Sequence, residues 1–127
     1  MAKYVLDASA VLALVHGEPG HQEVVRLLED AAISSVNLSE VAAKLIEKGL
    51  TIESIRPDLL ALGLEVVSFD EALAFRTAEL RPAARRSGLS LGDCVCLATA
   101  EMTRAVAVTA DRSWSTLKVP VKVRVLR

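Results

Sequence analysis

The stretch Tyr4-Val5-Leu6-Asp7-Ala8-Ser9-Ala10 decides the fold that we expect for this chain. Three strand-forming residues run straight into an aspartate, and an apolar run rich in Ala and Leu follows at 8–16. This order is typical of a short buried strand that turns directly into a helix. A second run of the same kind, Val106-Ala107-Val108-Thr109-Ala110-Asp111, also ends at an aspartate.

Strand-like and helix-like segments alternate along the rest of the chain. We expect strands at 3–6, 31–34, 64–69, 105–109 and 119–126, and helices at 8–16, 21–30, 37–50, 52–62, 70–87 and 90–104. Pro57 and Pro82 predict interruptions in two of the helices. The alternation predicts an α/β fold, with a parallel sheet covered by helices on both faces. The 127 residues contain no linker or repeat, so we expect a single domain over 1–127.

The composition narrows the possible partners. Apolar residues make up 52% of the chain, so we expect an apolar surface that is covered in a homodimer or by another protein. No apolar run approaches the roughly 20 residues that span a bilayer. The chain also lacks a long apolar signal segment, and we expect a cytoplasmic protein. The formal net charge of −1 excludes binding of nucleic acid by bulk positive charge, which leaves bridging metals and a local patch of Lys and Arg.

Four acidic residues stand in unusually apolar surroundings. Asp7 and Asp111 follow strands, and the carboxyl ends of parallel strands form the edge at which α/β proteins bind ligands. Glu40 is expected in the first turn of the helix after the second strand, at the same edge. Asp93 lies within the apolar segment 89–98, where an unpaired carboxylate would be costly to bury.

Each of these acids could instead have an ordinary structural role. Asp7 and Asp111 are both placed to cap a following helix. The segment 37–40, Asn-Leu-Ser-Glu, resembles a capping box. Ion pairs with basic residues are also open, namely Glu40 with Lys44 and Asp93 with Arg104 or Arg112.

Taken together, the four acids predict a metal site. Four carboxylates on one edge would repel one another strongly unless cations lay between them. Oxygen ligands without a Cys or His cluster select Mg²⁺ or Mn²⁺, and such a site suits phosphodiester hydrolysis. Ser9 and Thr109 could hydrogen-bond the ligands, or serve as an ordinary cap and strand residue. Cys94 and Cys96 are expected in the core, and His16 and His21 in a loop around the turn at 17–20.

At this point the sequence resembles a PIN-domain ribonuclease, specifically a VapC-type toxin of a toxin–antitoxin pair. Segments 4–10, 34–41, 89–100 and 109–114 carry the resemblance, in order and over nearly the whole chain. It implies a three-layer α/β/α PIN-like domain whose central parallel sheet has four to five strands. It further implies a single-strand-specific endoribonuclease that uses Mg²⁺ or Mn²⁺, a homodimer, and a small cognate antitoxin.

The resemblance also assigns the site residues. The acid of each matching segment is implied as a metal ligand, namely Asp7, Glu40, Asp93 and Asp111. Some relatives carry a further acid just after the fourth, where Ser113 stands here. Lys44, one turn beyond Glu40, could contact RNA phosphates, whereas a solvated helix face is the simpler role for Arg81, Arg85 and Arg86.

Three other functions compete with the nuclease. A receiver-like signalling domain would need paired acids after the first strand and an acceptor aspartate after the third, and the sequence offers neither. A haloacid-dehalogenase-type phosphatase would need an acid where Ser9 stands. A non-catalytic α/β interaction module, in which the acids are caps, remains a coherent alternative.

Overall fold

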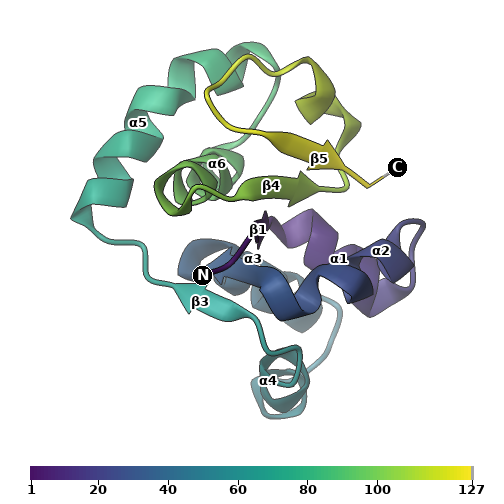
Figure 1. Cartoon of the computed structure of the whole chain (residues 1–127). Helices are drawn as coiled ribbons and strands as arrows, with labels where there is room; N and C mark the ends of the chain where they lie inside the picture. The colour runs from purple at the N-terminus through teal and green to yellow at the C-terminus, as the bar shows by residue number, and fades with distance from the viewer. Residues whose placement is uncertain (127) are drawn as a thin grey trace.

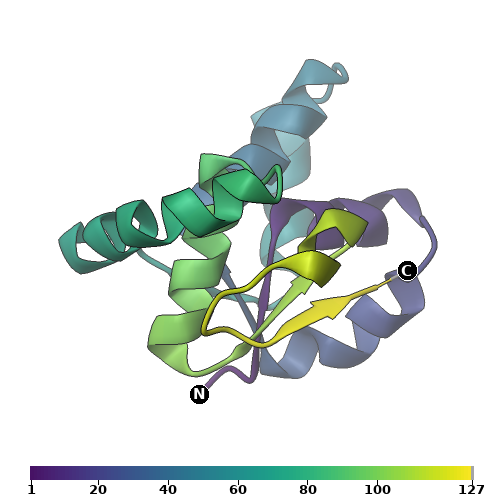
Figure 2. The same ribbon diagram turned by 90° about the horizontal axis from the view of Figure 1, so that it is seen from above.

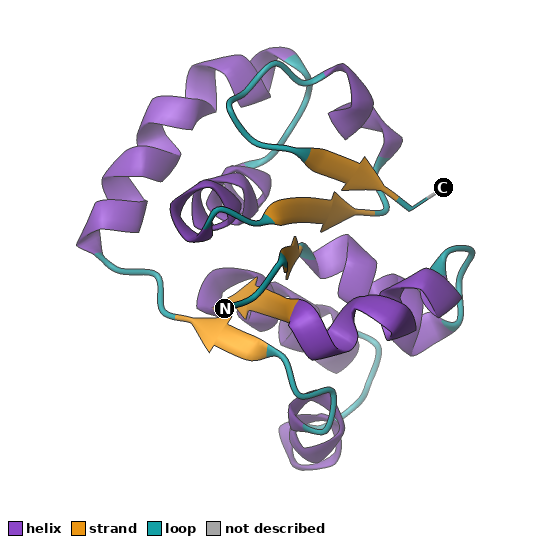
Figure 3. Ribbon diagram, in the orientation of Figure 1, coloured by secondary structure: helices purple, strands orange, loops and turns teal. Residues whose placement is uncertain are grey.

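The computed structural model describes residues 1–126 as a five-stranded parallel sheet with helices on both faces (Figure 1). The strands are β1 (Tyr4–Leu6), β2 (Ala31–Ser34), β3 (Glu65–Val67), β4 (Val106–Thr109) and β5 (Val123–Val125). The helices are α1 (Ala8–His16), α2 (His21–Leu27), α3 (Ser35–Glu47), α4 (Ile52–Leu60), α5 (Glu71–Arg86) and α6 (Leu91–Thr103), with short 3-10 helices η1 (Leu28–Asp30) and η2 (Arg112–Thr116). The predicted three-layer α/β/α fold is confirmed (Figure 3).

The strand order is β3-β2-β1-β4-β5, and every neighbouring pair is parallel. Figure 2 shows β1, β4 and β5 running away from the end of the sheet that holds the N-terminus. Leu6 pairs with Val108, so Asp7 and Thr109 emerge side by side at the carboxyl edge. A receiver domain would have the order 2-1-3-4-5, so the strand order argues against that alternative.

Alternating residues of the central strands face opposite helical layers, as strand geometry requires. Leu6, Ile33 and Val108 pack with apolar residues of α1, α2, α3 and α4. Val5, Ala32 and Ala107 pack instead with residues of α5, α6 and η2. The core is therefore two apolar clusters, one on each side of a sheet that is buried on both faces.

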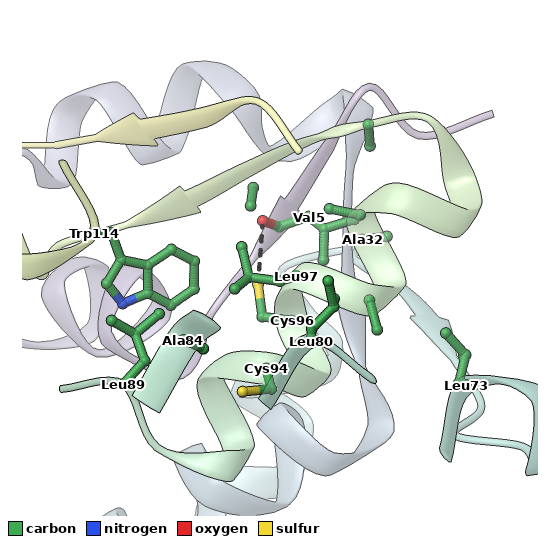
Figure 4. Packing of buried hydrophobic residues seen from close by; sticks show 14 residues of the cluster. Val5, Ala32, Leu73, Leu80, Ala84, Leu89, Cys94, Cys96, Leu97 and Trp114 are labelled. Carbon is green, nitrogen blue, oxygen red and sulfur yellow. Dashed lines mark hydrogen bonds between the residues drawn. The ribbon is translucent and has the colours of Figure 1, made fainter. Parts of the chain in front are cut away.

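The cluster under α5 and α6 contains the two cysteines and the single tryptophan (Figure 4). Cys94 and Cys96 are fully buried and free, which confirms the prediction that they are core residues. The Sγ of Cys96 donates a weak hydrogen bond to the carbonyl oxygen of Val5 at 3.8 Å, which ties α6 to β1. Trp114 fills the space between α5, α6 and η2.

The interruptions predicted at Pro57 and Pro82 are wrong, because both prolines lie inside continuous helices. Each proline removes one hydrogen bond from its helix. Pro82 and Ala78, whose carbonyl loses that bond, are both exposed, so water can satisfy the carbonyl. On the opposite side of α5, Leu80 and Ala84 are buried on either side of Pro82 and hold the helix in place.

The start of one helix also differs from the expectation, and so does the setting of the two histidines. The helix α3 begins at Ser35 rather than at 37, and its N-cap is Ser34, whose Oγ accepts from the Val36 N–H at 3.2 Å. The capping box expected at 37–40 is therefore wrong, and Glu40 lies in the second turn. His16 and His21 are the last residue of α1 and the first of α2, not loop residues. No helix within residues 1–126 is long and apolar enough to cross a membrane.

Candidate active site at the carboxyl edge of the sheet

The four acids singled out in the sequence line one open pocket of about 320 Å³. Asp7 and Asp111 reach it from the ends of β1 and β4, as their position after these strands predicts. Glu40 comes from α3 and Asp93 from the first turn of α6. Ser9, Lys44 and Ser90 complete the polar part of its lining. The structure thus brings together four side chains that are spread over more than one hundred residues of sequence.

Asp7 is the buried member of the set, with 3% of its surface exposed. Its Oδ1 accepts from the Ala10 N–H at 2.8 Å, so Asp7 is the N-cap of α1 as well as a pocket residue. The Ser9 Oγ lies 2.7 and 2.9 Å from its two oxygens, and the Thr109 Oγ1 donates to Oδ2 at 2.5 Å. The expectation that Ser9 and Thr109 hydrogen-bond an acid of the site is confirmed for Asp7.

Burial raises the pKa of Asp7 to about 6, because a carboxylate that leaves water loses its hydration. The hydrogen bonds from Thr109, Ala10 and Ser9 oppose this shift, since they stabilise the charged form. The negative charge of Asp93 adds a smaller upward contribution. Asp7 is therefore a carboxyl group whose charged state is costly unless positive charge is supplied nearby.

Glu40 is positioned by a contact that the sequence did not reveal. Asn37, one turn earlier on α3 and only 1% exposed, donates through Nδ2 to the Glu40 Oε1 at 2.7 Å. The same Nδ2 lies 3.0 Å from the carbonyl oxygen of Gly92, on α6. A Cβ on Gly92 would lie 2.5 Å from the Glu40 Oε2, closer than any real contact allows. Gly92 therefore provides the space in which the Glu40 carboxylate lies.

Asp111 has the capping role that its position after β4 suggests, and Asp93 has a capping role that was not expected from the sequence. The Asp93 Oδ2 accepts from the Ser90 N–H at 2.8 Å in a capping box at the start of α6. The Asp111 Oδ1 accepts from the Ser113 N–H and hydroxyl at 2.9 and 2.8 Å. Each acid uses one oxygen for its cap. Within residues 1–126, no hydrogen bond from the protein reaches Asp93 Oδ1, Asp111 Oδ2 or Glu40 Oε2, which leaves these oxygens for a ligand.

The expected ion pairs of these acids do not form in the described part of the chain. Neither Glu40 with Lys44 nor Asp93 with Arg104 or Arg112 comes within 4 Å. Asp93 is partly exposed at the helix start, so it does not need the buried partner that its apolar neighbours suggested. Arg81 has a structural role, because it donates to the Leu89 carbonyl oxygen at 2.6 Å, while Arg85 and Arg86 are exposed.

The donor set of the pocket fits Mg²⁺ or Mn²⁺, since it consists of carboxylate and hydroxyl oxygens without sulfur or imidazole. As the side chains lie, no group of three or more acidic, Cys or His residues among 1–126 is close enough together to hold an ion. Mutual repulsion of the carboxylates favours such separated conformations. A bound cation would therefore require the side chains of Glu40, Asp93 and Asp111 to move toward Asp7.

Solved structures of similar fold include members of toxin–antitoxin systems. A DNA-bound VapBC from Salmonella typhimurium matches with a TM-score of 0.75 and 23% identity, covering 100% of both chains. A toxin–antitoxin complex from Klebsiella pneumoniae gives a TM-score of 0.74 at 21% identity, covering 98% of both chains. FitAcB from Neisseria gonorrhoeae gives 0.73 at 23% identity, covering 97% of both.

These likenesses establish the fold, and the sequence itself establishes the family. No curated protein sequence matches the chain. The model of the PIN domain family, however, matches residues 4–119, which include all four acids and nearly the whole chain. With the sheet order and the acid-lined pocket in place, this match shows that the chain belongs to the PIN domain family.

Proposed function

We propose that this protein is a divalent-metal-dependent endoribonuclease that cleaves single-stranded regions of RNA. The observation that carries the proposal is the gathering of Asp7, Glu40, Asp93 and Asp111 around one pocket at the carboxyl edge of the sheet. Nuclease activity is the usual activity of the PIN domain family to which the chain belongs. If the acids served only as helix caps, nothing would require all four carboxylates to line the same cavity.

The four acids are the proposed ligands of Mg²⁺ or Mn²⁺. When bound, such a cation lowers the pKa of a water molecule and offsets negative charge on a phosphodiester. The chain's own residues prepare the site for it. Ser9 and Thr109 fix the orientation of Asp7, and Asn37 fixes that of Glu40. Asp93 and Asp111 each use one oxygen for a cap and keep the other free of hydrogen bonds from residues 1–126. Lys44 lies at the rim of the same pocket, where its charge can meet a phosphate.

We further propose that the protein is the toxin of a toxin–antitoxin pair, a homodimer that binds a cognate antitoxin. The similar structures from toxin–antitoxin complexes support this role. So does an apolar groove between α3, α4 and β3, whose lining includes Leu38, Leu59 and Leu60. Exposed apolar side chains border it, among them Ile52 and Val66. A surface of this kind is typical of a site covered by another protein.

The proposal is tested by incubating purified protein with a mixed single-stranded RNA pool, with Mg²⁺, with Mn²⁺ and with a chelator. Asp7→Asn is the critical variant, because the amide keeps the shape of the side chain and an oxygen for the Ala10 N–H. We expect cleavage that depends on the metal and falls about 10²–10³-fold in Asp7→Asn, as when a principal electrostatic contact is removed. A single-stranded DNA pool of the same length tests the choice of RNA.

Asp70→Asn is the matched control, since Asp70 also caps a helix, accepting from the Leu73 N–H at 2.9 Å, but does not line the pocket. Its activity should equal that of the wild type. The nuclease proposal is overturned if RNA stays intact and neither metal raises the melting temperature, because a bound ligand stabilises the folded state by mass action. That result would favour the interaction module, in which the acids are only caps.

A further inference from the structure

A second groove opens directly beside the acid pocket and has a different character. The two cavities share Ser9, Leu12, Lys44 and Asp111 in their linings. Beyond this common wall, the second groove is lined by His16, Glu18, Lys48 and Ala110. The two cavities are therefore neighbours, and a strand that enters the acid pocket can extend over this wall to the second groove.

The positive charge of this groove comes from one helix face. Lys44 lies in the last turn of α3 and Lys48 is the C-cap of that helix, one turn further on; both are exposed and both line the groove. Like charges at this spacing repel each other slightly, although positive charge at the carboxyl end of a helix is favourable. The pair also lines up two cations that lead away from the metal site proposed above.

His16, the last residue of α1, holds one of these cations in place. The Lys48 Nζ lies 3.1 Å from the His16 Nε2. Because an ammonium group can only donate, Nε2 accepts, and the ring proton is on Nδ1. This hydrogen bond uses one of the three N–H groups of Lys48 and leaves two for a ligand.

Two acids lie in the same groove and set limits on its ligand. Glu18 follows α1 and already has an interaction partner in the structure. Asp111 lines both cavities. The charge of Asp111 is one that a cation in the acid pocket would offset. The groove therefore suits an anion best when the adjoining pocket is loaded with metal.

We propose that this groove binds the phosphate next to the scissile one in a single-stranded RNA, through Lys44 and Lys48, with His16 as the positioning residue of Lys48. The inference rests on the proposed function and names a part of its substrate that the four acids do not contact. It means that the enzyme recognises a polynucleotide strand and not an isolated phosphodiester. A substrate with a single phosphate would occupy only the acid pocket.

The test measures RNA binding in an Asp7→Asn background, where cleavage does not interfere, with enough Mg²⁺ to load the pocket through the three remaining acids. A fluorescent single-stranded oligonucleotide is titrated by anisotropy at several salt concentrations with Mg²⁺ present. We expect Lys48→Gln to weaken binding about three- to tenfold and to lower the slope of log K against log salt by about 0.7, the value for one phosphate contact of a single strand. Lys48→Arg should retain most of the affinity, and His16→Ala should lose part of it.

Lys122→Gln is the matched control. Lys122 is also exposed, but it precedes β5 and lies at the opposite edge of the sheet. A set of oligonucleotides, each with one neutral methylphosphonate linkage, then locates the contact. Neutralising the correct phosphate should reproduce the loss seen in Lys48→Gln and add nothing further in that variant.

The outcomes separate this inference from the proposed function. If the wild type cleaves RNA but Lys48→Gln binds no worse than Lys122→Gln, the phosphate site is refuted and the nuclease stands. If RNA binds through Lys48 but is never cut with either metal, the nuclease is refuted and the binding site stands. A single defined phosphate site would also be refuted if every neutral linkage weakened binding by Lys48→Gln as much as it weakens binding by the parent protein.

Discussion

The acid pocket has two walls that are built in different ways. The inner wall consists of Asp7 and Ser9, from the end of β1 and the start of α1, and is backed by the buried Thr109 of β4; hydrogen bonds join all three residues. The outer wall consists of Glu40 on α3 and Asp93 on α6, and behind Glu40 the side chain of Asn37 joins the two helices by bonding the Gly92 carbonyl oxygen. The inner wall is rigid because the strand register fixes it. The outer wall depends on how closely α3 and α6 approach each other.

The two walls differ in which property of a side chain the site restricts. At the inner wall, burial makes the charge of Asp7 costly, and the hydrogen bonds of its neighbours only partly offset that cost. At the outer wall, the Glu40 carboxylate is exposed to solvent on one side and is limited by the backbone of Gly92 on the other. The inner wall is therefore sensitive to charge, and the outer wall is sensitive to volume.

The largest expected effect concerns the charge of Asp7. Its pKa is about 6 in the folded protein and 3.8 in the unfolded chain, so its contribution to stability is fully present below pH 4 and is lost as the pH rises through 6. The loss corresponds to about 3 kcal/mol. In metal-free protein, we therefore expect the wild type to lose stability relative to Asp7→Asn by a similar amount as the pH rises from 4 to 7.5.

Urea unfolding in the presence of a chelator measures this difference, with Asp70→Asn as the control. The free energy of unfolding of Asp70→Asn should not rise relative to that of the wild type over this pH range. A constant difference between Asp7→Asn and the wild type would show that burial does not penalise the Asp7 charge. Adding Mg²⁺ at pH 7.5 should stabilise the wild type more than Asp7→Asn, since a cation is expected to recover the loss.

The next effect concerns the volume of the outer wall. In Gly92→Ala the new methyl group would collide with the Glu40 carboxylate, which must then turn away from Asn37. We expect cleavage and metal affinity to fall about 10–100-fold, as when a group that orients a metal ligand is lost. Ala is a better helix former than Gly, so the melting temperature should not fall in parallel.

Leu91→Ala is the neighbouring control, because Leu91 is exposed in the same turn of α6 and lies outside the pocket lining. Titration of Mn²⁺, followed by melting temperature, reports metal affinity without relying on cleavage. Unchanged metal affinity in Gly92→Ala would mean that Glu40 has room to ligate from another conformation, and the volume limit would be wrong.

The smallest effect returns to the inner wall. Thr109→Val keeps the shape of the side chain but removes the hydroxyl that donates to the Asp7 Oδ2. Since that bond favours the charged carboxylate, its loss should raise the pKa of Asp7 further, by about one unit or less. The acid limb of the pH–rate profile should move upward by the same amount and return in Thr109→Ser. A shift that Thr109→Ser fails to reverse would point to a packing defect.

Much of the fold and the inner wall could be predicted from local sequence. Strand runs that end in Asp7 and Asp111 predicted both the parallel sheet and the edge that carries the acids, because backbone alternation fixes which residues emerge there. The helix breaks at Pro57 and Pro82 were wrong, since burial of the opposite face outweighs one lost hydrogen bond. The start of α3 was misplaced because Ser34 and Asn37 are both good caps.

The sequence by itself determined the four acids, the hard-oxygen chemistry they share and the layered α/β architecture, because these follow from residue types and short-range periodicity. The packing of the helices, in contrast, was needed to show that Asn37 reaches Gly92 beside Glu40, and that Lys48 and His16 meet in a groove next to the acid pocket. These contacts join residues 32 to 55 positions apart. Their distances depend on how helices pack across the sheet, which no local pattern encodes.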